Sequence, residues 1–496
     1  MPYLSTRNKT LRVTSAAAIA HGLAEDGGLF VPASLPRLDL DQIQAMCAMP
    51  YARRAAVILD KFLPEFTTDE LDKFTTCAYN EKTFDTPSIA PLRKLVDDTW
   101  FLELWHGPTA AFKDMALQIM PHLLSASLQK TGETRQVVML TATSGDTGTA
   151  ALAGFCDVPQ TKILVFYPKD GVSAIQEMQM CTQAGGNLAV NGVSGNFDDA
   201  QSAVKAMFSD STLKHELAER GYVFSSANSI NWGRLVPQIV YYFSAYCELL
   251  NTGEILPRDF VHFAVPTGNF GNILAGFYAK QMGLPIAKLI CASNENNVLT
   301  EFIHTGGYNR KRPFHHTISP SMDILVSSNL ERLLFSLSGG DDRLIAEYMQ
   351  DLAQSGSFTV SPQIKQGLDQ LLWASCCDDL RTKKAIASTY RAHGYLIDPH
   401  TAVAAHALEQ YRTETGDSTP CVVVSTASPY KFADSVLNAL GAPVDLDVFA
   451  QIDKLANLTG VAPPRPLLEL CGKPIRFASV VDKAEMPNMV RKHLFA

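Results

Sequence analysis

The chain has 496 residues, of which 46% are hydrophobic and 19% are charged, with a formal net charge of −8 and a pI near 5.9. A chain of this length exceeds one hydrophobic core, so we expect two to four domains. The composition is that of a globular enzyme and excludes a disordered or fibrous chain. The acidic balance, without a basic stripe, argues against nucleic acid as a partner.

The cysteines and the apolar stretches indicate the compartment. The ten cysteines are scattered, and only Cys376 and Cys377 are adjacent. Without a C-x-x-C pair we expect reduced thiols in a cytoplasmic protein and no metal site. The N-terminus lacks the apolar core of a signal peptide. The most apolar stretch, 235–250, is interrupted by Pro237 and Glu248 and is too short to span a bilayer, so we expect no membrane partner.

Residues 1–98 are predicted to form a separate N-terminal unit. The run Asp-Gly-Gly at 26–28 predicts a turn into a short strand at 29–32. Helical patterns follow at 42–49, 55–62 and 67–79. No titratable cluster in this unit suggests chemistry, so we expect it to serve packing.

A strand pattern at 99–105 leads into the stretch 106–118, which reads His-Gly-Pro-Thr-Ala-Ala-Phe-Lys-Asp-Met-Ala-Leu-Gln. We expect Thr109 to cap a helix, which places Lys113 in its first turn. The positive end of the helix dipole disfavours an ammonium group there. A neutral amine in that position can attack a carbonyl. The alternative is a surface lysine with its charge in water, and this segment alone favours that alternative.

Strand and helix patterns alternate from residue 136 onward. The predicted strands lie at 136–143, 162–167, 187–190, 222–225, 260–265, 287–292 and 421–425. The predicted helices lie at 149–155, 173–183, 198–208, 233–250, 273–281, 342–354, 362–372, 385–393, 401–413 and 431–440. Residues 305–340 are irregular, and the last 50 residues are expected to form a surface appendage. This alternation predicts α/β units with parallel sheets.

Three loops between a strand and a helix carry polar residues, and in a parallel sheet they would open on one carboxyl edge. The first comprises Gly268, Asn269, Phe270, Gly271 and Asn272. Its glycines permit close approach, so successive backbone N–H groups can converge on a phosphate at a helix N-terminus. It is neither a Walker loop nor the dinucleotide fingerprint. An ordinary turn is the alternative.

The second loop runs from Ser144 to Gly148, and the third contains Thr426. The second could hold a substrate carboxylate or phosphate through N–H groups, Ser144 and Thr147. An amide is more expected there than the carboxylate of Asp146, for which helix capping is the alternative role. The hydroxyl of Thr426 could bond to a ring nitrogen or cap the next helix. A lysine for carbonyl chemistry, a phosphate-binding loop and a partner for a pyridine nitrogen are together what pyridoxal phosphate requires.

With these residues in place, the chain resembles the threonine synthase family of fold type II pyridoxal-phosphate enzymes. The resemblance is carried by the motifs Ser-Thr-Arg at 5–7, Asp-Gly-Gly-Leu-Phe-Val-Pro at 26–32, His-Gly-Pro-Thr-Ala-Ala-Phe-Lys-Asp at 106–114, Thr-Ser-Gly-Asp-Thr-Gly at 143–148, Asn-Ser-Ile-Asn-Trp-Gly-Arg at 228–234, Pro-Thr-Gly-Asn-Phe-Gly-Asn at 266–272 and Ser-Pro-Ser-Met-Asp-Ile-Leu at 319–325. Their combination and order are specific. One position departs from the family pattern, because Ser428 stands where a histidine is expected.

The resemblance implies an α/β fold like that of the tryptophan synthase β subunit, with two parallel-sheet domains and an N-terminal domain. We therefore expect an N-terminal domain at 1–98, a small α/β domain at 135–233, and a large cofactor-binding domain at 99–134 and 234–496 that includes the C-terminal appendage.

The same resemblance implies conversion of O-phospho-L-homoserine and water into L-threonine and phosphate by γ-elimination and β-addition. Lys113 is then the residue that holds the cofactor and removes the Cα proton. The expected cofactor contacts are Lys113, Gly268, Asn269, Phe270, Gly271, Asn272, Thr426 and Phe112. The expected substrate contacts are Ser144, Asp146, Thr147, Asn228, Asn231 and Arg234. We expect a monomer or a homodimer.

Three alternatives share part of this pattern. A sister lyase, such as a threonine or serine dehydratase or a phospholyase, would keep Lys113 and the phosphate loop but release ammonia. A non-catalytic phosphometabolite-binding protein is opposed by the lysine. A nicotinamide dehydrogenase is opposed by the missing dinucleotide fingerprint.

Overall fold

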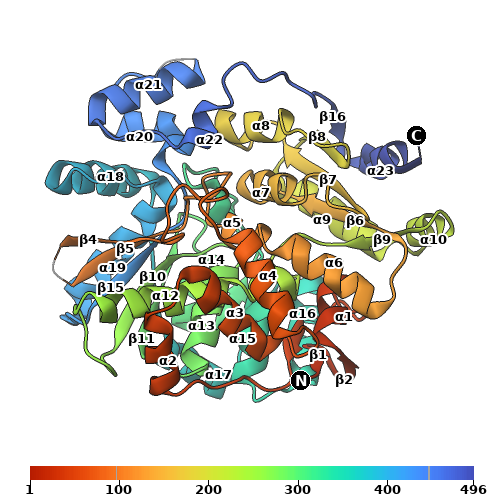
Figure 1. The fold of residues 1–496 in the computed structure, drawn as a ribbon, viewed down its shortest axis with the longest axis horizontal. Helices are drawn as coiled ribbons and strands as arrows, with labels where there is room; N and C mark the ends of the chain where they lie inside the picture. Colours follow the sequence, from red (N-terminus) through yellow and green to blue (C-terminus); the bar gives the residue numbers. More distant parts are fainter. Residues whose placement is uncertain (97, 445–446, 496) are drawn as a thin grey trace.

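The structure is a computed structural model that describes residues 1–96, 98–444 and 447–495. Two parallel-stranded sheets with helices on their faces form the body of the molecule, and a small antiparallel sheet lies near the N-terminus (Figure 1). The predicted α/β class with two parallel-sheet units and an N-terminal part is confirmed.

The strands are β1 (Tyr3–Ser5), β2 (Asn8–Val13), β3 (Phe30–Pro32), β4 (Leu92–Val96), β5 (Thr99–Glu103), β6 (Gln136–Ala142), β7 (Thr161–Pro168), β8 (Leu188–Ser194), β9 (Tyr222–Ser225), β10 (Val261–Pro266), β11 (Ile286–Ser293), β12 (Gly307–Asn309), β13 (Ser357–Thr359), β14 (Leu372–Cys376), β15 (Cys421–Ser425) and β16 (Val480–Asp482).

The helices are α1 (Ser15–His21), α2 (Leu40–Cys47), α3 (Tyr51–Phe62), α4 (Thr68–Ala78), α5 (Asp114–Leu117), α6 (Met120–Thr131), α7 (Asp146–Gly154), α8 (Ala174–Cys181), α9 (Phe197–Ser209), α10 (Ser211–Glu219), α11 (Trp232–Leu235), α12 (Gln238–Asn251), α13 (Gly271–Gln281), α14 (Val298–Thr305), α15 (Leu330–Leu337), α16 (Asp342–Gln354), α17 (Pro362–Leu371), α18 (Asp379–His393), α19 (Pro399–Thr415), α20 (Ala433–Ala439), α21 (Val448–Thr459), α22 (Arg465–Leu468) and α23 (Met486–Phe495). Short 3-10 turns are η1 (Pro320–Met322), η2 (Pro429–Phe432) and η3 (Lys483–Glu485).

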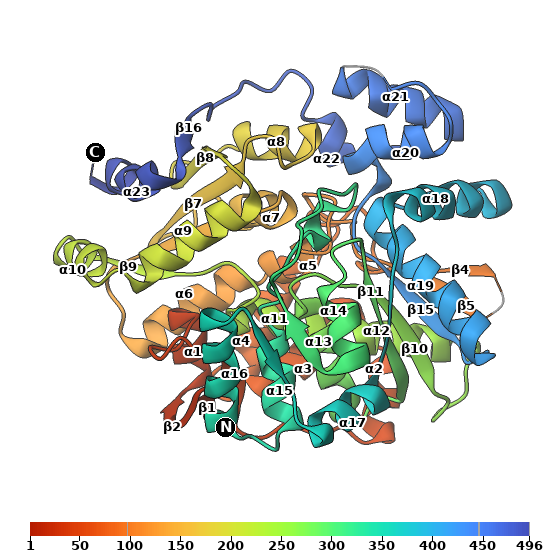
Figure 2. The ribbon, with the colours of Figure 1, turned by 180° about the vertical axis from the view of Figure 1, so that it is seen from behind.

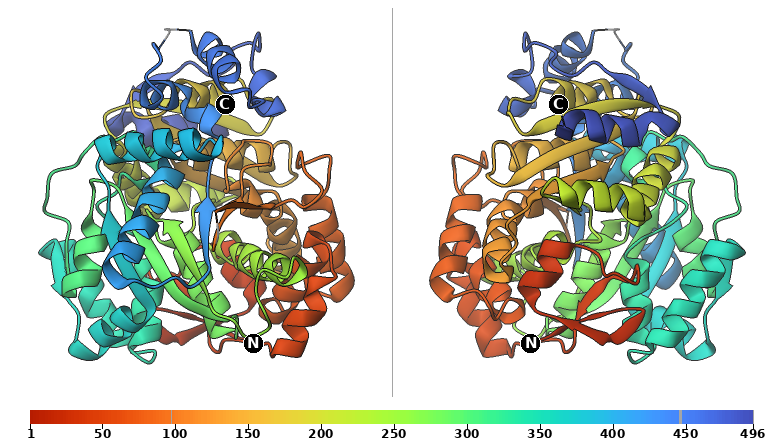
Figure 3. Two further views of the ribbon diagram at one scale, coloured as in Figure 1. Left: turned by 90° about the vertical axis from the view of Figure 1, so that its left-hand side faces the viewer. Right: turned by 90° about the vertical axis from the view of Figure 1, so that its right-hand side faces the viewer.

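The large sheet has the strand order β14-β11-β10-β15-β5-β4, in which only the β5–β4 pair is antiparallel. The small sheet has the order β16-β8-β7-β6-β9 and is parallel throughout. The two sheets occupy different regions of the molecule in both side views (Figure 3). Because both are parallel, the loops that leave their carboxyl ends are the natural places for a site.

The domain boundaries at residues 98, 134 and 233 stay a prediction, and two strands lie across them. The edge strand β4 falls within the predicted N-terminal unit but pairs with β5 of the large sheet. The strand β16 falls within the predicted C-terminal appendage but pairs in parallel with β8 of the small sheet. The appendage is therefore not only a surface extension of the large unit, because its end completes the small sheet (Figure 2).

The structure corrects the helix expected around the lysine. Thr109 does not cap it, since its backbone N–H and hydroxyl both donate to the carboxylate of Asp114, at 2.8 Å each. Lys113 itself stands at the N-cap position of the short helix α5, and the chain turns again at Ile119 before α6 begins. The side chain of Asp114 satisfies the Thr109 donors, so this segment is a bonded turn that ends at the lysine rather than a continuous helix.

Other differences follow from local chemistry. The helix predicted at 233–250 is divided into α11 and α12, because Pro237 cannot continue the hydrogen-bond ladder. The irregular stretch 305–340 contains β12, η1 and α15, and the short elements α10, α14 and β14 were not predicted. Among the described residues, no helix is long and apolar enough to cross a membrane.

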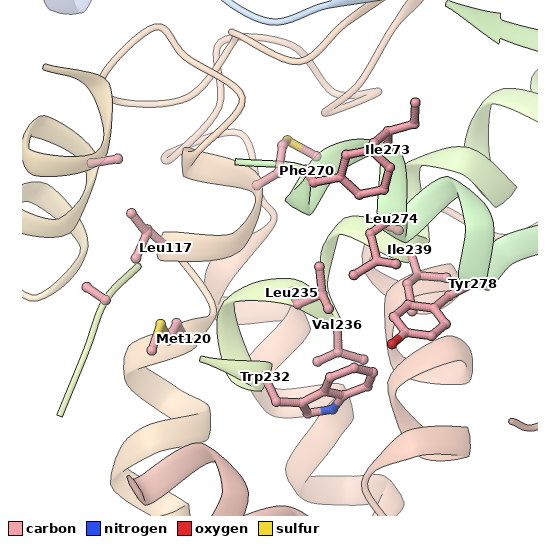
Figure 4. Close-up of a cluster of buried hydrophobic side chains, with 14 of the residues drawn as sticks. Leu117, Met120, Trp232, Leu235, Val236, Ile239, Phe270, Ile273, Leu274 and Tyr278 are labelled. Carbon is pink, nitrogen blue, oxygen red and sulfur yellow. The ribbon is translucent and has the colours of Figure 1, made fainter. Parts of the chain in front are cut away.

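A buried apolar cluster joins α5, α6, α11, α12 and α13 and lies under the polar loops. Figure 4 shows Phe270 and Ile273 at one end of this cluster, with Leu235, Val236 and Trp232 further along it. All five side chains are buried. The start of α13 is therefore fixed from below by packing, which is how a rigid scaffold positions loop residues.

Close packing between the units can be tested at Gly154, the last residue of α7. A Cβ atom there would collide with the backbone carbonyl oxygen of Leu117 in α5. We expect Gly154→Ala to lower stability by about 1–3 kcal/mol, because backbone atoms must shift to accept it. The measurement is the urea midpoint of unfolding. In the matched control Gly186→Ala, the new Cβ would lie 3.6 Å from Asp157 Oδ1, so no loss is expected.

Candidate active site

The polar loops lie at the carboxyl ends of strands that belong to both sheets. The loops after β10 and β15 leave neighbouring strands of the large sheet, whereas the 144–148 loop leaves β6 of the small sheet. The three loops therefore do not share one sheet edge, as the sequence pattern suggested. They contribute instead to a region between the two sheets, where residues from all of them surround a cleft of about 1040 Å³.

Lys113 lines this cleft and is buried. Its Nζ atom lies 3.3 Å from Asp146 Oδ2 and 3.3 Å from Ser321 Oγ. The ring of Phe112 lies 5.1 Å from the same atom, and its backbone N–H donates to Thr426 O at 2.8 Å. The lysine amine thus contacts groups from two other segments, and the bond to Thr426 fixes the backbone next to it.

The environment of Lys113 lowers the pKa of its amine. Burial is the main cause that lowers the pKa of the amine, and the neighbouring positive charges of Arg234 and Lys431 lower it further. The carboxylate of Asp146 opposes this shift, and the pKa stays below that of an ordinary lysine. A lysine of this kind is suited to act as a nucleophile or base near neutral pH.

Asp146 is held between two lysines. Its Oδ1 atom lies 2.8 Å from Lys431 Nζ and accepts a hydrogen bond of 2.8 Å from Gln176 Nε2. Burial opposes ionisation, but the ammonium groups of Lys113 and Lys431 outweigh it and keep the pKa of Asp146 well below its usual value. Asp146 is the first residue of α7, although its side chain serves these contacts rather than capping the helix.

The loop 268–272 has the features of a phosphate-binding site. All five residues line the cleft, and the first turn of α13 has no hydrogen bond from a capping side chain. Phe270 adopts a left-handed backbone conformation with φ of 63°, which turns the chain at the start of the helix. Among the described residues, Asn269 Oδ1 and Asn272 Nδ2 have no hydrogen-bond partner. A helix start with free N–H groups and unpaired amides fits the 5′-phosphate of pyridoxal phosphate.

Thr426 lines the same cleft immediately after β15. Its backbone N–H donates to Thr401 Oγ1 at 3.3 Å, which fixes the backbone. The position departing from the family pattern, Ser428, is fully buried and accepts a hydrogen bond of 3.3 Å from Tyr430 N. Ser428 therefore caps η2 and does not line the cleft. A lysine, a phosphate loop and a threonine on one cleft fit pyridoxal phosphate.

The expected substrate contacts separate into two groups. Thr147, Asn228 and Arg234 line the cleft, and both Asn228 Oδ1 and Arg234 Nε are buried without a hydrogen-bond partner among the described residues. Burial lowers the pKa of the Arg234 guanidinium to about 10, so it stays charged. Ser144, Asp146 and Asn231 are not among the cleft-lining residues.

Asn231 caps the helix that carries Arg234. Its Oδ1 accepts from Gly233 N at 2.9 Å, and its Nδ2 donates to Ile19 O and Ser226 O at 3.0 and 3.1 Å. All its polar atoms are engaged, so the structure does not bring this side chain to a substrate.

Three residues of the site were absent from the sequence prediction. Ser321 bonds to Lys113, and Lys431 pairs with Asp146. His400 lines the cleft and accepts from Ser321 N at 3.2 Å through Nε2, while its Nδ1 lies 2.8 Å from Asp398 Oδ1. Ser321 lies in a recognised motif, and Asp398-Pro-His400 marks a helix start, but neither pattern alone indicates a cleft.

Comparisons with known proteins agree with this geometry. A model of the family described as "Pyridoxal-phosphate dependent enzyme" matches residues 84–427, between models for "Threonine synthase N terminus" at 2–79 and "Threonine synthase, C-terminal" at 401–489. The threonine synthase of Pseudomonas aeruginosa is 41% identical over 440 residues, which cover 88% of this chain and 90% of that protein. The crystal structure of pyridoxal-phosphate-bound threonine synthase from Brucella melitensis is 36% identical, with a TM-score of 0.87 over the full length of both chains.

A human protein named "Threonine synthase-like 1" is 42% identical over 433 residues. The match covers 85% of this chain but 57% of the human protein, so the chain spans little more than half the length of that relative.

The phosphate-binding loop can be tested at Gly268. A Cβ atom there would lie 2.6 Å from the backbone oxygen of Ser321, so the loop has to move away from η1. We expect Gly268→Ala to weaken binding of pyridoxal phosphate at least about tenfold, an energy of about 1.4 kcal/mol. Fluorescence titration of the cofactor-free protein measures this. Unchanged affinity would show that the loop does not hold the cofactor, and Gly186→Ala is again the control.

Proposed function

The chain belongs to the threonine synthase family of pyridoxal-phosphate-dependent enzymes, and from this premise we propose that it converts O-phospho-L-homoserine and water into L-threonine and phosphate. This reaction makes it a carbon–oxygen lyase that acts on phosphates, in the last step of threonine biosynthesis. The observation that supports it most directly is Lys113, a buried amine with a lowered pKa on the cleft that the phosphate-binding loop also lines.

We propose that Lys113, Asn269, Asn272 and Thr426 hold the cofactor, together with the backbone of Gly268, Phe270 and Gly271 and the ring of Phe112. Pyridoxal phosphate, when bound, supplies an electron sink that stabilises negative charge next to the substrate amino group. The N–H groups at the start of α13 would bind its phosphate, and the Thr426 hydroxyl would bond the ring nitrogen. Phe112 is held beside the lysine through its backbone bond to Thr426.

Lys113 then moves protons. Its neutral Nζ removes the Cα proton of the substrate and, once it has given that proton up, takes the Cβ proton, after which phosphate leaves from Cγ. The two carbon-bound protons are returned at Cα and Cγ, and the proton that water gives up on adding at Cβ goes to the phosphate. Asp146 Oδ2, at 3.3 Å, accepts an N–H of the amine and so directs its lone pair away from the carboxylate. One water molecule is required to add at Cβ.

Arg234 and Asn228 are proposed to bind the substrate phosphate. Both line the cleft, Arg234 is buried and Asn228 is half-buried, and each carries a buried polar atom without a hydrogen-bond partner among the described residues. The loop 144–148 is proposed to bind the substrate carboxylate through Thr147 and the N–H groups at the start of α7. Asn231 acts indirectly in this proposal, because it caps the helix that carries Arg234.

We also propose a cytoplasmic protein that acts as a monomer or a homodimer. The location is supported by ten free cysteines, which fit a reducing compartment.

The product distinguishes this function from that of a sister lyase. Purified protein with pyridoxal phosphate and O-phospho-L-homoserine should release phosphate and threonine in equal amounts and no ammonia. Release of ammonia with a keto acid would assign the chain to the dehydratase or phospholyase type. No release of either from this substrate would overturn the proposal.

Lys113→Ala is expected to abolish turnover and the visible absorbance of the cofactor-loaded protein, because no amine remains to bond the cofactor. Borohydride reduction of the unmodified protein followed by peptide mapping should place the pyridoxyl group on Lys113. The control is Lys288→Ala, since Lys288 Nζ donates to Asp369 O and Gln370 O away from the cleft. Normal turnover in the Lys113→Ala variant would contradict the assignment.

A further inference from the structure

Lys431 is a buried charge that the proposed reaction does not use. Its side chain is fully shielded from solvent, and its Nζ lies 2.8 Å from Asp146 Oδ1 and donates to Thr109 O at 2.8 Å. The opposite oxygen of the same carboxylate, Asp146 Oδ2, lies 3.3 Å from Lys113 Nζ and 3.4 Å from Ser321 Oγ. The carboxylate of Asp146 thus lies between the amines of Lys113 and Lys431. The closer contact is with Lys431, which takes no part in the proposed reaction.

The contact with Lys431 affects how strongly the charge of Asp146 acts on Lys113. A lone carboxylate next to Lys113 in a dry site would hold the amine as an ammonium ion, since opposite charges within about 4–6 Å stabilise each other. A base must release its proton in order to act. A second cation fixed on the far oxygen balances the carboxylate and leaves the near oxygen as a hydrogen-bond acceptor.

We propose that Lys431 is a permanent counter-ion for Asp146, which leaves the amine of Lys113 free to cycle between its neutral and protonated forms. Lys431 is a positioning residue in this role, because it acts on Lys113 only through Asp146. The inference deepens the proposed function, in which Lys113 is the base. It also explains why a carboxylate is tolerated in a loop where an amide was expected.

The other charged groups around Lys113 do not replace Lys431. Arg234 is buried and donates through Nη1 to Ala227 O at 2.7 Å. His400, on α19, has Nδ1 2.8 Å from Asp398 Oδ1 and accepts from Ser321 N through Nε2, so both ring nitrogens are engaged by partners other than Asp146. Lys431 is thus the cation in direct contact with the far oxygen of Asp146.

The test is the titration of Lys113 in three full-length variants, Lys431→Met, Asp146→Asn and the double variant. Loss of Lys431 leaves Asp146 unbalanced and should raise the pKa of Lys113. Loss of the carboxylate leaves two cations near each other and should lower it. The double variant removes both charges, so the pKa of Lys113 should return toward its value in the unmodified protein. A shift of about one pH unit in each single variant corresponds to about a tenfold change in the neutral fraction of the amine.

Two readouts measure this. Competitive acetylation of the cofactor-free chain across pH, followed by mass spectrometry of the Lys113 peptide, gives the pKa without a substrate. In the cofactor-loaded protein, the acidic limb of the kcat profile should move to higher pH in Lys431→Met and to lower pH in Asp146→Asn. A merely structural role would lower stability in both variants but would not shift the two titrations in opposite directions.

The control is Lys280→Met, since Lys280 Nζ donates to Ala287 O at 2.8 Å, at the far end of α13. It should leave the Lys113 titration unchanged. Shifts of the same sign in both single variants, or no shift in either, would overturn the counter-ion role. Because acetylation needs no substrate, this result stands apart from the proposed reaction, which fails only if the unmodified protein releases no threonine.

Discussion

The site depends on three charged side chains that are buried together. Lys113, Asp146 and Lys431 come from the start of α5, the start of α7 and the turn η2, which are far apart in the sequence. Removing one partner from such a buried set leaves an uncompensated charge, at a cost of about 3–5 kcal/mol. The three segments therefore cannot separate without exposing or stranding a charge. The same contacts that position the lysine also hold the small sheet against the large one.

The scaffold explains why these segments meet. Each sheet is parallel, so its loops emerge at one edge, and the two edges contribute to one cleft. The large sheet supplies the lysine segment, the phosphate loop and Thr426, while the small sheet supplies the loop with Asp146 and Thr147. A cofactor bound to the first group therefore faces residues of the second. The apolar cluster beneath α13 holds the phosphate loop in place (Figure 4). The charged side chains lie where the loops of the two sheets meet.

The sequence was sufficient for the fold class and for the residues with an unusual local pattern. The strands β9 and β15 and the helix α16 were predicted at their observed bounds, because hydrophobic periodicity and flanking turns marked them. The glycine loop and Lys113 were singled out because each lies between a predicted strand and a predicted helix, and the structure places both on the cleft. Lys431 could not be predicted, since its role comes from a partner that lies 285 positions away in the sequence. The assignment of the three loops to two different sheets was not predicted, because the local sequence pattern does not determine the order of strands in a sheet.

The C-terminal segment shows how a distant part of the chain supports this site. Tyr430, beside Lys431 in η2, donates its hydroxyl to Val461 O, after helix α21. Further on, Arg476 N donates to Cys181 O at 2.8 Å, and β16 then pairs with β8 of the small sheet. The last segment thus runs from the large sheet to the small one on the side seen in Figure 2. This segment begins at the turn that holds Lys431 and ends on the sheet whose loop carries Asp146. Its hydrogen bonds therefore join the same two parts of the molecule that the ion pair between Lys431 and Asp146 joins.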